Sequence, residues 1–107
     1  MAWRPEVVTL ERLATHPATP SALLEALALH PMPEVRAALA ENKNTPTDCI
    51  WQLAKDNDPN VRYQLAEVHT LPESILQFLT DDDNPYVACR AKRTLNRLKG
   101  SGLDALD

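Results

Sequence analysis

Six prolines divide the middle of this chain into segments of equal length. They stand at positions 20, 33, 46, 59, 72 and 85, so that neighbouring members are 13 residues apart. A fixed spacing of this kind is the sequence signature of an internal repeat. Glycine, the other residue that commonly ends a helix, occurs only at positions 100 and 102. Proline must therefore separate the structural elements of residues 1–99.

The residues between these prolines show that the true period is 26, with two alternating halves. The first half carries apolar residues at Leu23, Leu24 and Leu27, and the same columns are apolar 26 and 52 residues later. The second half carries them at Val35 and Leu39 and again at the equivalent later positions. The spacings i, i+1, i+4 and i, i+4 place these residues on one face of a helix. Each half therefore predicts one short helix.

Proline is favoured at the first helical position because its missing N–H needs no partner there and its φ is already set. A capping residue is expected before it, and Thr19, Thr45, Asp58 and Asn84 occupy that place. Proline also disfavours helix in the residue before it, so each proline ends the preceding helix. The predicted helices lie near 5–15, 20–29, 33–42, 46–55, 59–68, 72–80 and 85–98.

Helices this short are marginal alone and have to pack against one another. The pattern predicts an all-α fold, a short HEAT-like α-solenoid of about three 26-residue two-helix repeats with an N-terminal helix before them. The last helix has no proline stop, and Lys92 replaces the alanine found at positions 40 and 66. Such a change suits a terminal, capping helix. We expect residues 1–99 to form one helical repeat domain and residues 100–107 to form a flexible tail.

Residues 30–42 and 44–66 resemble the leucine-rich repeat variant family, a HEAT-like class of bacterial helical repeats. The shared pattern is a Thr-Pro helix start, a Leu-Ala helix end, an Asp/Pro turn, a Val-Arg pair, and then Leu-Ala and Asn. The resemblance covers roughly residues 14–98. It departs in the longer repeat, in the missing Val-Arg pair of the third repeat, and in lacking the N-terminal iron–sulfur cysteines known in one member. The resemblance implies a binding scaffold with no enzymatic activity and no cofactor.

Charge and cysteine content exclude several classes of protein. The net charge is −4, which disfavours a generally basic nucleic-acid binder. Residues 1–89 are acidic, with six Lys/Arg against thirteen Asp/Glu, whereas residues 90–107 have five against two. Cys49 and Cys89 form no CxxC pair, which predicts neither a disulfide scaffold nor a zinc cluster. With no leader or membrane-spanning stretch in view, we expect a cytoplasmic protein with two buried, inert thiols.

No group of residues predicts catalysis. The glycine-free body excludes a P-loop, a dinucleotide-binding fingerprint and a nucleophile elbow. His16, His30 and His69 fall in three different repeat columns, so we expect them to face solvent or cap turns and to form no metal site. The sequence therefore predicts a protein that is not an enzyme and that binds no metal.

The turns within the repeats are rich in aspartate, at positions 56, 58, 81, 82 and 83. Oxygen ligands of this kind suit a hard cation such as calcium, but no glycine-containing loop of alternating acids accompanies them. The favoured interpretation is that these carboxylates cap helices and pair with Arg36 and Arg62, which follow the core valines at equivalent positions.

Three groups of side chains are candidates for binding. Trp51 stands in an otherwise polar column, so it either anchors a partner at the surface or folds back over Phe78. Tyr63 and Tyr86 lie on the second helices, where acidic columns early in the chain give way to basic ones. The last helix carries three arginines at i, i+3 and i+7, on one face: Arg90, Arg93 and Arg97.

The arginine stripe suits an acidic peptide or a phosphate chain, or else it is a solvated cap that complements the helix dipole. The function we expect is a non-catalytic scaffold that binds a protein or peptide through Trp51, Tyr63, Tyr86 and these arginines. The alternative is a nucleic-acid-binding HEAT-like module that uses the basic C-terminal helix, although the acidic remainder makes nucleic acid an unfavoured partner. Self-association through one end of the stack would give a weak homodimer in place of a monomer.

Overall fold

The described part of the chain, residues 5–99 of a computed structural model, is helical throughout and contains no strand. The all-α prediction is therefore correct. Helices α2 and α4 to α6 are a few residues shorter than predicted, and the end of α3 continues as a 3-10 turn. Residues 1–4 and the predicted tail 100–107 lie outside the described residues. The elements are α1 (Pro5–Thr15), α2 (Ser21–Leu27), α3 (Pro33–Ala38), η1 (Leu39–Glu41), α4 (Thr47–Ala54), α5 (Pro59–Ala66), α6 (Glu73–Leu79) and α7 (Pro85–Lys99).

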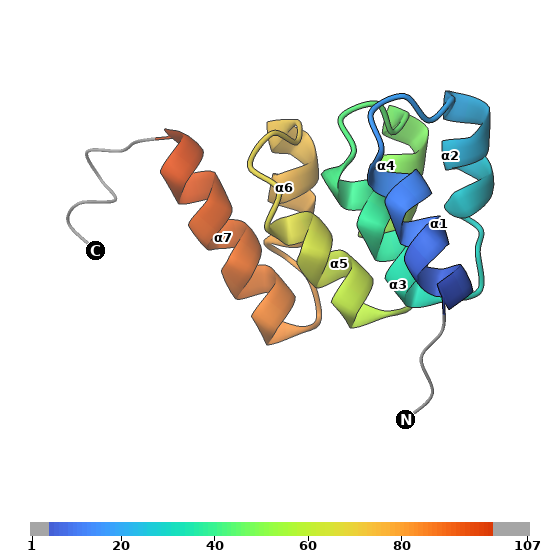
Figure 1. The fold of residues 1–107 in the computed structure, drawn as a ribbon. Coiled ribbons are helices and arrows are strands. Elements are labelled where there is room, and N and C mark those ends of the chain that lie inside the picture. Colours follow the sequence, from blue (N-terminus) through green and yellow to red (C-terminus); the bar gives the residue numbers. More distant parts are fainter. Residues whose placement is uncertain (1–4, 100–107) are drawn as a thin grey trace.

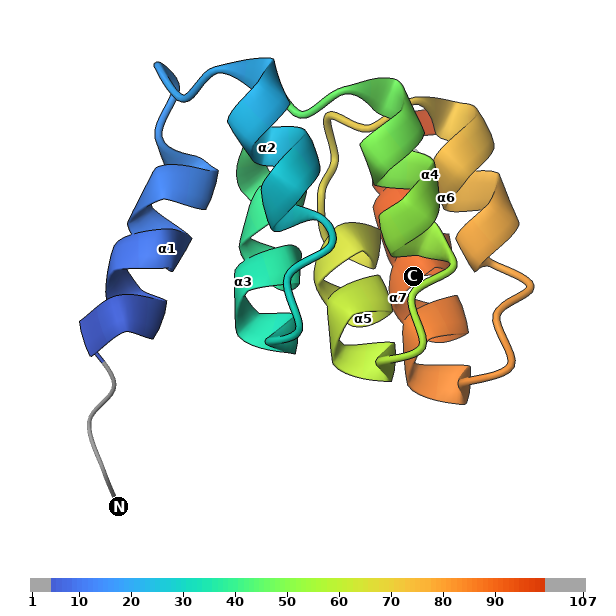
Figure 2. The same cartoon turned by 90° about the vertical axis from the view of Figure 1, so that its right-hand side faces the viewer.

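The helices form two layers that alternate along the chain. Figures 1 and 2 show α1, α3, α5 and α7 side by side in one layer, and α2, α4 and α6 in the other. Within the first layer α1 packs on α3, α3 on α5, and α5 on α7. We call this the odd layer, and the layer of α2, α4 and α6 the even layer. Across the layers α1 packs on α2, α4 on α5, α5 on α6 and α6 on α7, and within the even layer α4 packs on α6.

The core lies between the two layers and is made of the predicted apolar columns. Alanines at 14, 66 and 91 are fully buried where helices of the odd layer approach one another. Leu23 departs from the prediction because it is exposed on α2, which stands at one end of the even layer (Figure 2). The largest fully buried side chains are Leu24, Leu39, Leu53, Leu65, Ile75, Leu76, Leu79, Val35, Val61, Val87 and Thr94.

Prolines begin the helices of the odd layer in the predicted way. Pro33, Pro59 and Pro85 are the first residues of α3, α5 and α7. Asp58 and Asn84 cap the last two of these helices. Their side-chain oxygens accept hydrogen bonds from the backbone N–H two residues ahead, at 2.8 and 2.9 Å. These bonds satisfy amide groups that the first turn leaves unpaired.

Prolines of the even layer act differently. Pro20, Pro46 and Pro72 have extended backbone and precede the first helical residue. The prediction that Thr19 and Thr45 cap these helices is therefore wrong, because the extended proline separates each hydroxyl from the first turn. Both hydroxyls are buried and donate instead to the carbonyl six residues earlier, at 2.6 and 2.9 Å. Each threonine thus supplies a hydrogen-bond donor to a carbonyl group near the end of the preceding helix.

Two buried polar side chains connect neighbouring helices of the odd layer. Asn42 Nδ2 donates to the carbonyls of Ala14 and His16 at 2.8 and 3.0 Å, joining η1 to the end of α1. Thr94 Oγ1 donates to the carbonyl of Ala66 at 2.6 Å, joining α7 to α5. The two positions are two periods of 26 apart, and the residue midway between them is Val68, which has no donor to offer.

We expect Thr94→Val to lower the free energy of unfolding by about 1–2 kcal/mol, because the nearly isosteric valine leaves the Ala66 carbonyl buried without its donor. For a domain of this size the melting temperature should fall by roughly 4–8 °C per kcal/mol. Circular dichroism melting measures the change, and the exposed Thr70→Val is the control. Equal melting temperatures for the two variants would show that the hydroxyl does not connect α7 to α5.

Among the described helices, none combines the length and the apolar content that a membrane span requires.

Candidate functional site

Two arginines of the odd layer pair with aspartates twenty residues later, as predicted. Arg36 donates from Nε and Nη2 to the two carboxylate oxygens of Asp56, at 2.7 and 3.0 Å. Arg62 makes the same paired contact with Asp82, at 2.8 and 3.2 Å. Each pair joins an odd-layer helix to the turn that follows the next even-layer helix. Fork geometry of this kind is the strongest form of arginine–carboxylate contact.

The third nitrogen of each guanidinium group also donates a hydrogen bond. Arg36 Nη1 donates to the carbonyl of His30 at 2.7 Å, and Arg62 Nη1 donates to the carbonyl of Asp56 at 2.5 Å. Both guanidinium groups therefore hold turns of their own chain. Their contacts favour the predicted structural role over ligand binding.

The turn carboxylates are occupied in the same way. One oxygen of Asp56 also accepts from the backbone N–H of Asp58, and Asp82 accepts from that of Asn84, both at 2.9 Å. Arginine and amide donors therefore occupy the carboxylate oxygens that a calcium ion would need as ligands. Among residues 5–99, no three His, Cys, Asp or Glu side chains meet in an arrangement that could hold a metal ion.

The environment of Asp56 favours its ionised form. Burial by itself raises the pKa of Asp56, but the hydrogen bonds from Arg36 and from the Asp58 N–H, with the charges of Arg36 and Arg62, hold it below its ordinary value of 3.8. The pKa of Arg36 is raised in turn, chiefly by its hydrogen bond to Asp56. The pair is therefore ionised at neutral pH.

This pKa predicts how stability depends on pH. Because the folded-state pKa of Asp56 lies below the unfolded value, its contribution is complete above about pH 4 and is lost as pH falls through the folded pKa. We expect Asp56→Asn to be less stable than the native chain by roughly 2 kcal/mol at pH 7, with the difference shrinking in acid. Urea denaturation across this pH range measures it, with the exposed Asp83→Asn as control. A difference that stays constant with pH would contradict the prediction.

The positions of the three histidines agree with the prediction that they cap turns or face solvent. His16 Nδ1 accepts from the Ala18 N–H at 3.0 Å, and His30 Nδ1 accepts from the Met32 N–H at 3.1 Å. His69 is exposed.

The expectation of two buried thiols holds for one of them only. Cys49 is buried, and burial, followed by the charges of Glu25 and Asp48, raises the pKa of its thiol. Cys89 is exposed. It lies on α7, which is the last helix of the described residues and ends the odd layer (Figure 1). Lys92 of the same helix is exposed too, where the equivalent Ala40 and Ala66 are buried.

Trp51 folds back over Phe78, the second of its two predicted alternatives. The two rings meet edge to face, with centroids 5.6 Å apart and planes at 75°. Lys55 Nζ lies 5.9 Å from the Trp51 ring centroid. Trp51 is half-buried and belongs to α4 of the even layer. The structure therefore separates it from the other binding candidates, which belong to the odd layer.

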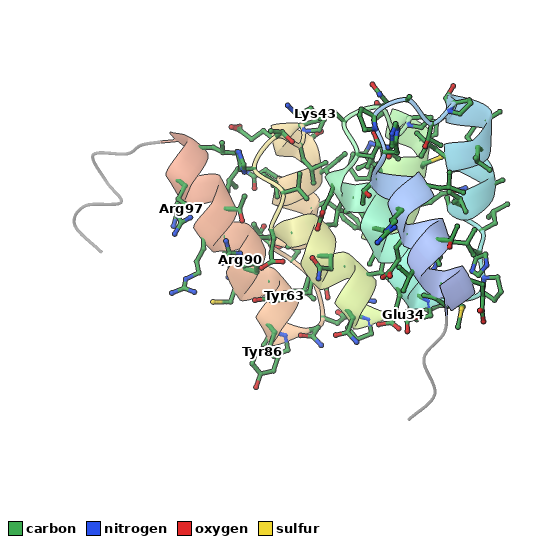
Figure 3. The ribbon with its side chains drawn as sticks, viewed as in Figure 1. Glu34, Lys43, Tyr63, Tyr86, Arg90 and Arg97 are labelled. Atoms are coloured by element: carbon green, nitrogen blue, oxygen red, sulfur yellow. The ribbon has the colours of Figure 1, made fainter. Side chains whose placement is uncertain are left out.

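Tyr63 and Tyr86 are brought together between α5 and α7. Tyr86 is 76% exposed and projects from the first turn of α7 (Figure 3), whereas Tyr63 is half-buried. Both line a cavity of about 300 Å³, which we call the tyrosine cavity. Its other lining residues are Pro59, Asn60, Asn84 and Val87.

Arg90 and Arg97 line a second cavity, of about 350 Å³, where α7 meets the turn that follows α5. We call it the arginine cavity. Figure 3 shows Arg90 in the middle of α7 and Arg97 near its end. Arg93 is exposed on α7 but does not line this cavity. The other lining residues are Glu67, His69, Thr94 and Leu98.

A third cavity, of about 510 Å³, opens between α1, α3 and α5. Its charged lining residues are all acidic: Glu11, Glu34, Glu41 and Asp58. Asn60 lines both this acidic cavity and the tyrosine cavity, so the two adjoin. The acidic, tyrosine and arginine cavities thus follow the sequence pattern, in which the second helices are acidic early in the chain and basic late. The participation of Glu11 and His69 was not predicted, because neither belongs to the columns of the second helices from which this surface was inferred.

Comparison of the sequence with models of protein families gave no match, and comparisons with curated proteins and with solved structures gave none either.

Proposed function

We propose that this chain is a non-catalytic α-solenoid scaffold that binds a protein or a peptide along the odd layer. The observation that carries this proposal is Tyr86, an aromatic side chain 76% exposed beside a cavity that it shares with Tyr63. Tyrosine is enriched among the residues that contribute most to binding at protein interfaces. The proposal includes a cytoplasmic, bacterial protein related to the leucine-rich repeat variants, acting as a monomer or weak homodimer.

Recurring contacts support the solenoid part of the proposal. The Arg36–Asp56 pair returns 26 residues later as Arg62–Asp82 with the same forked geometry. The threonine bonds of the even-layer turns also recur at this interval. Links that repeat with the sequence period are typical of stacked two-helix units, and such stacks bind partners along one layer of helices.

The use made of the polar side chains supports a binding role over a catalytic one. The arginine–aspartate pairs hold turns, and two histidines accept backbone hydrogen bonds in other turns. Catalysis needs a nucleophile or an acid–base pair free to meet a substrate, whereas these groups are engaged in holding the fold.

Charge favours a protein over a nucleic acid as the partner. The acidic cavity, with Glu11, Glu41 and Asp58 in its lining, adjoins the tyrosine cavity. A phosphate backbone that approached the arginines of α7 would run into these carboxylates, and repulsion between like charges weakens binding.

Peptide display tests the proposal. Random peptides displayed on phage are selected on the immobilised full chain, and the enriched peptides are then synthesised. We expect Tyr86→Ala to weaken their binding about tenfold or more, while Phe78→Ala, an aromatic substitution in the even layer, leaves it unchanged. Failure to enrich any peptide, or enriched peptides that bind equally well to Tyr86→Ala, would contradict the proposed surface. Light scattering over a range of concentrations measures self-association.

A further inference from the structure

Arg90 has a buried donor with no partner. Its Nε atom is shielded from solvent, and it is the buried side-chain polar atom that lacks a hydrogen bond within residues 5–99. Arg36 and Arg62, the other half-buried arginines of the odd layer, both have their Nε donors bonded to aspartate. An unpaired buried N–H is unfavourable relative to the same group in water. No side-chain hydrogen bond within the described residues therefore holds the Arg90 guanidinium in the fold, which leaves its terminal nitrogens for an acceptor from outside the chain.

The arginine cavity provides the space for such an acceptor. Arg90 and Arg97 contribute two positive charges to its lining, and Glu67 contributes one negative charge. No ion pair within residues 5–99 involves either arginine. The cavity is thus positively charged overall, and no carboxylate of the described residues pairs with either of its two guanidinium groups.

We propose that the arginine cavity binds a carboxylate side chain of an acidic peptide, while Tyr63 and Tyr86 hold an apolar side chain of the same peptide. This inference rests on the peptide-binding function proposed above and adds the chemistry of the partner. A carboxylate accepts two parallel hydrogen bonds from one guanidinium group. A phosphoryl group accepts the same kind of hydrogen bonds from arginine, and binding measurements distinguish the two ligands.

The helix sets the spacing that the peptide must have. Tyr86 and Arg90 are one turn apart on α7, about 6 Å along its axis, and Tyr86 and Arg97 are about 16 Å apart. An extended peptide advances about 3.3 Å per residue. The apolar residue and the carboxylate should therefore be separated by about two to five residues. Arg93, exposed between the two positions, adds positive charge that attracts an acidic segment.

Fluorescence anisotropy with the full chain tests this inference. The probe is a short fluorescein-labelled peptide with one Phe followed at this spacing by Glu residues, in a background of Ala and Ser. Its matched partner has Gln in place of every Glu. We expect the Glu peptide to bind at least about tenfold more tightly than the Gln peptide, and Arg90→Met to remove that preference. Glu67→Gln should strengthen binding of the Glu peptide, because it removes a like charge from the cavity wall.

Melting of the free protein separates binding from a structural role. If Arg90 serves a ligand, Arg90→Met should leave the melting temperature unchanged or raise it, because the buried unpaired donor is gone. A lowered melting temperature together with an unchanged preference for the Glu peptide would assign Arg90 to the fold and overturn the inference.

Other outcomes distinguish this inference from the function on which it rests. Equal binding of the Glu and Gln peptides that still depends on Tyr86 would overturn the carboxylate site and leave the peptide-binding surface standing. Binding of neither peptide, together with failure of the display selection, would overturn both. A phosphoserine peptide or duplex DNA that binds through Arg90 more tightly than the Glu peptide would replace the carboxylate by a phosphate ligand and overturn the inference.

Discussion

Arg62→Ala is expected to lower the free energy of unfolding by about 2–3 kcal/mol. Asp82, whose side chain is 7% exposed, would keep its charge but lose both guanidinium donors. Loss of one partner leaves a nearly buried charge uncompensated, which costs about 3–5 kcal/mol at fully buried sites. We place the effect below that range because Arg62 itself is 17% exposed. Urea denaturation followed by circular dichroism measures it.

A double-mutant cycle separates the pair from the rest of the Arg62 side chain. Arg62→Ala, Asp82→Ala and the double variant should give a coupling energy of about 1–3 kcal/mol between the two residues. The exposed Arg93→Ala is the matched control and should change stability by no more than about 0.5 kcal/mol. An unchanged melting curve for Arg62→Ala, accompanied by loss of peptide binding, would instead make Arg62 part of the binding surface.

Leu65→Ala is expected to have the largest effect on stability. Leu65 is completely buried in α5, between α3 and α7 of the odd layer. Truncating a buried leucine removes apolar contacts and leaves a cavity, which together cost about 2–5 kcal/mol. Single domains have total stabilities of about 5–15 kcal/mol. A substantial fraction of the Leu65→Ala molecules should therefore be unfolded at a moderate temperature. Calorimetry and urea denaturation both measure the loss.

The matched control is Leu29→Ala, because Leu29 lies in the turn after α2 and is 75% exposed. The same deletion there should change stability by no more than about 0.5 kcal/mol. Similar losses for the two variants would mean that the packing of α5 between its neighbours is not what stabilises the domain.

The proline spacing predicts where helices begin, and the apolar columns predict which faces they bury. Both are local properties of the chain. The function of Thr19 and Thr45 could not be predicted in this way. Whether a threonine before proline caps the next helix or bonds to the previous one depends on whether the proline is itself helical. Pro59 is helical and Pro46 is not, although both belong to the same series of prolines spaced 13 residues apart.

For the candidate site too, the sequence predicts which residues lie on adjacent helices but does not predict how every side chain bonds. Equivalent positions in a 26-residue pattern place Tyr63 and Tyr86 on adjacent helices, and the pairing of Arg62 with a turn aspartate follows from the same register. The contact of Trp51 with Phe78 stayed one of two alternatives, because side-chain conformation decides between them. The unpaired Nε of Arg90 could not be anticipated, since it depends on which acceptors the neighbouring turn happens to offer.

The prolines that shape the turns also act on the unfolded chain. No residue between 5 and 99 has a positive φ, so each turn is built without the left-handed conformation that glycine usually supplies. Glycine would enlarge the set of conformations open to the unfolded chain, whereas proline restricts it. With nine prolines and no glycine before residue 100, this chain loses less conformational entropy on folding than one of average composition. Helices of two turns thereby need less packing energy to remain folded.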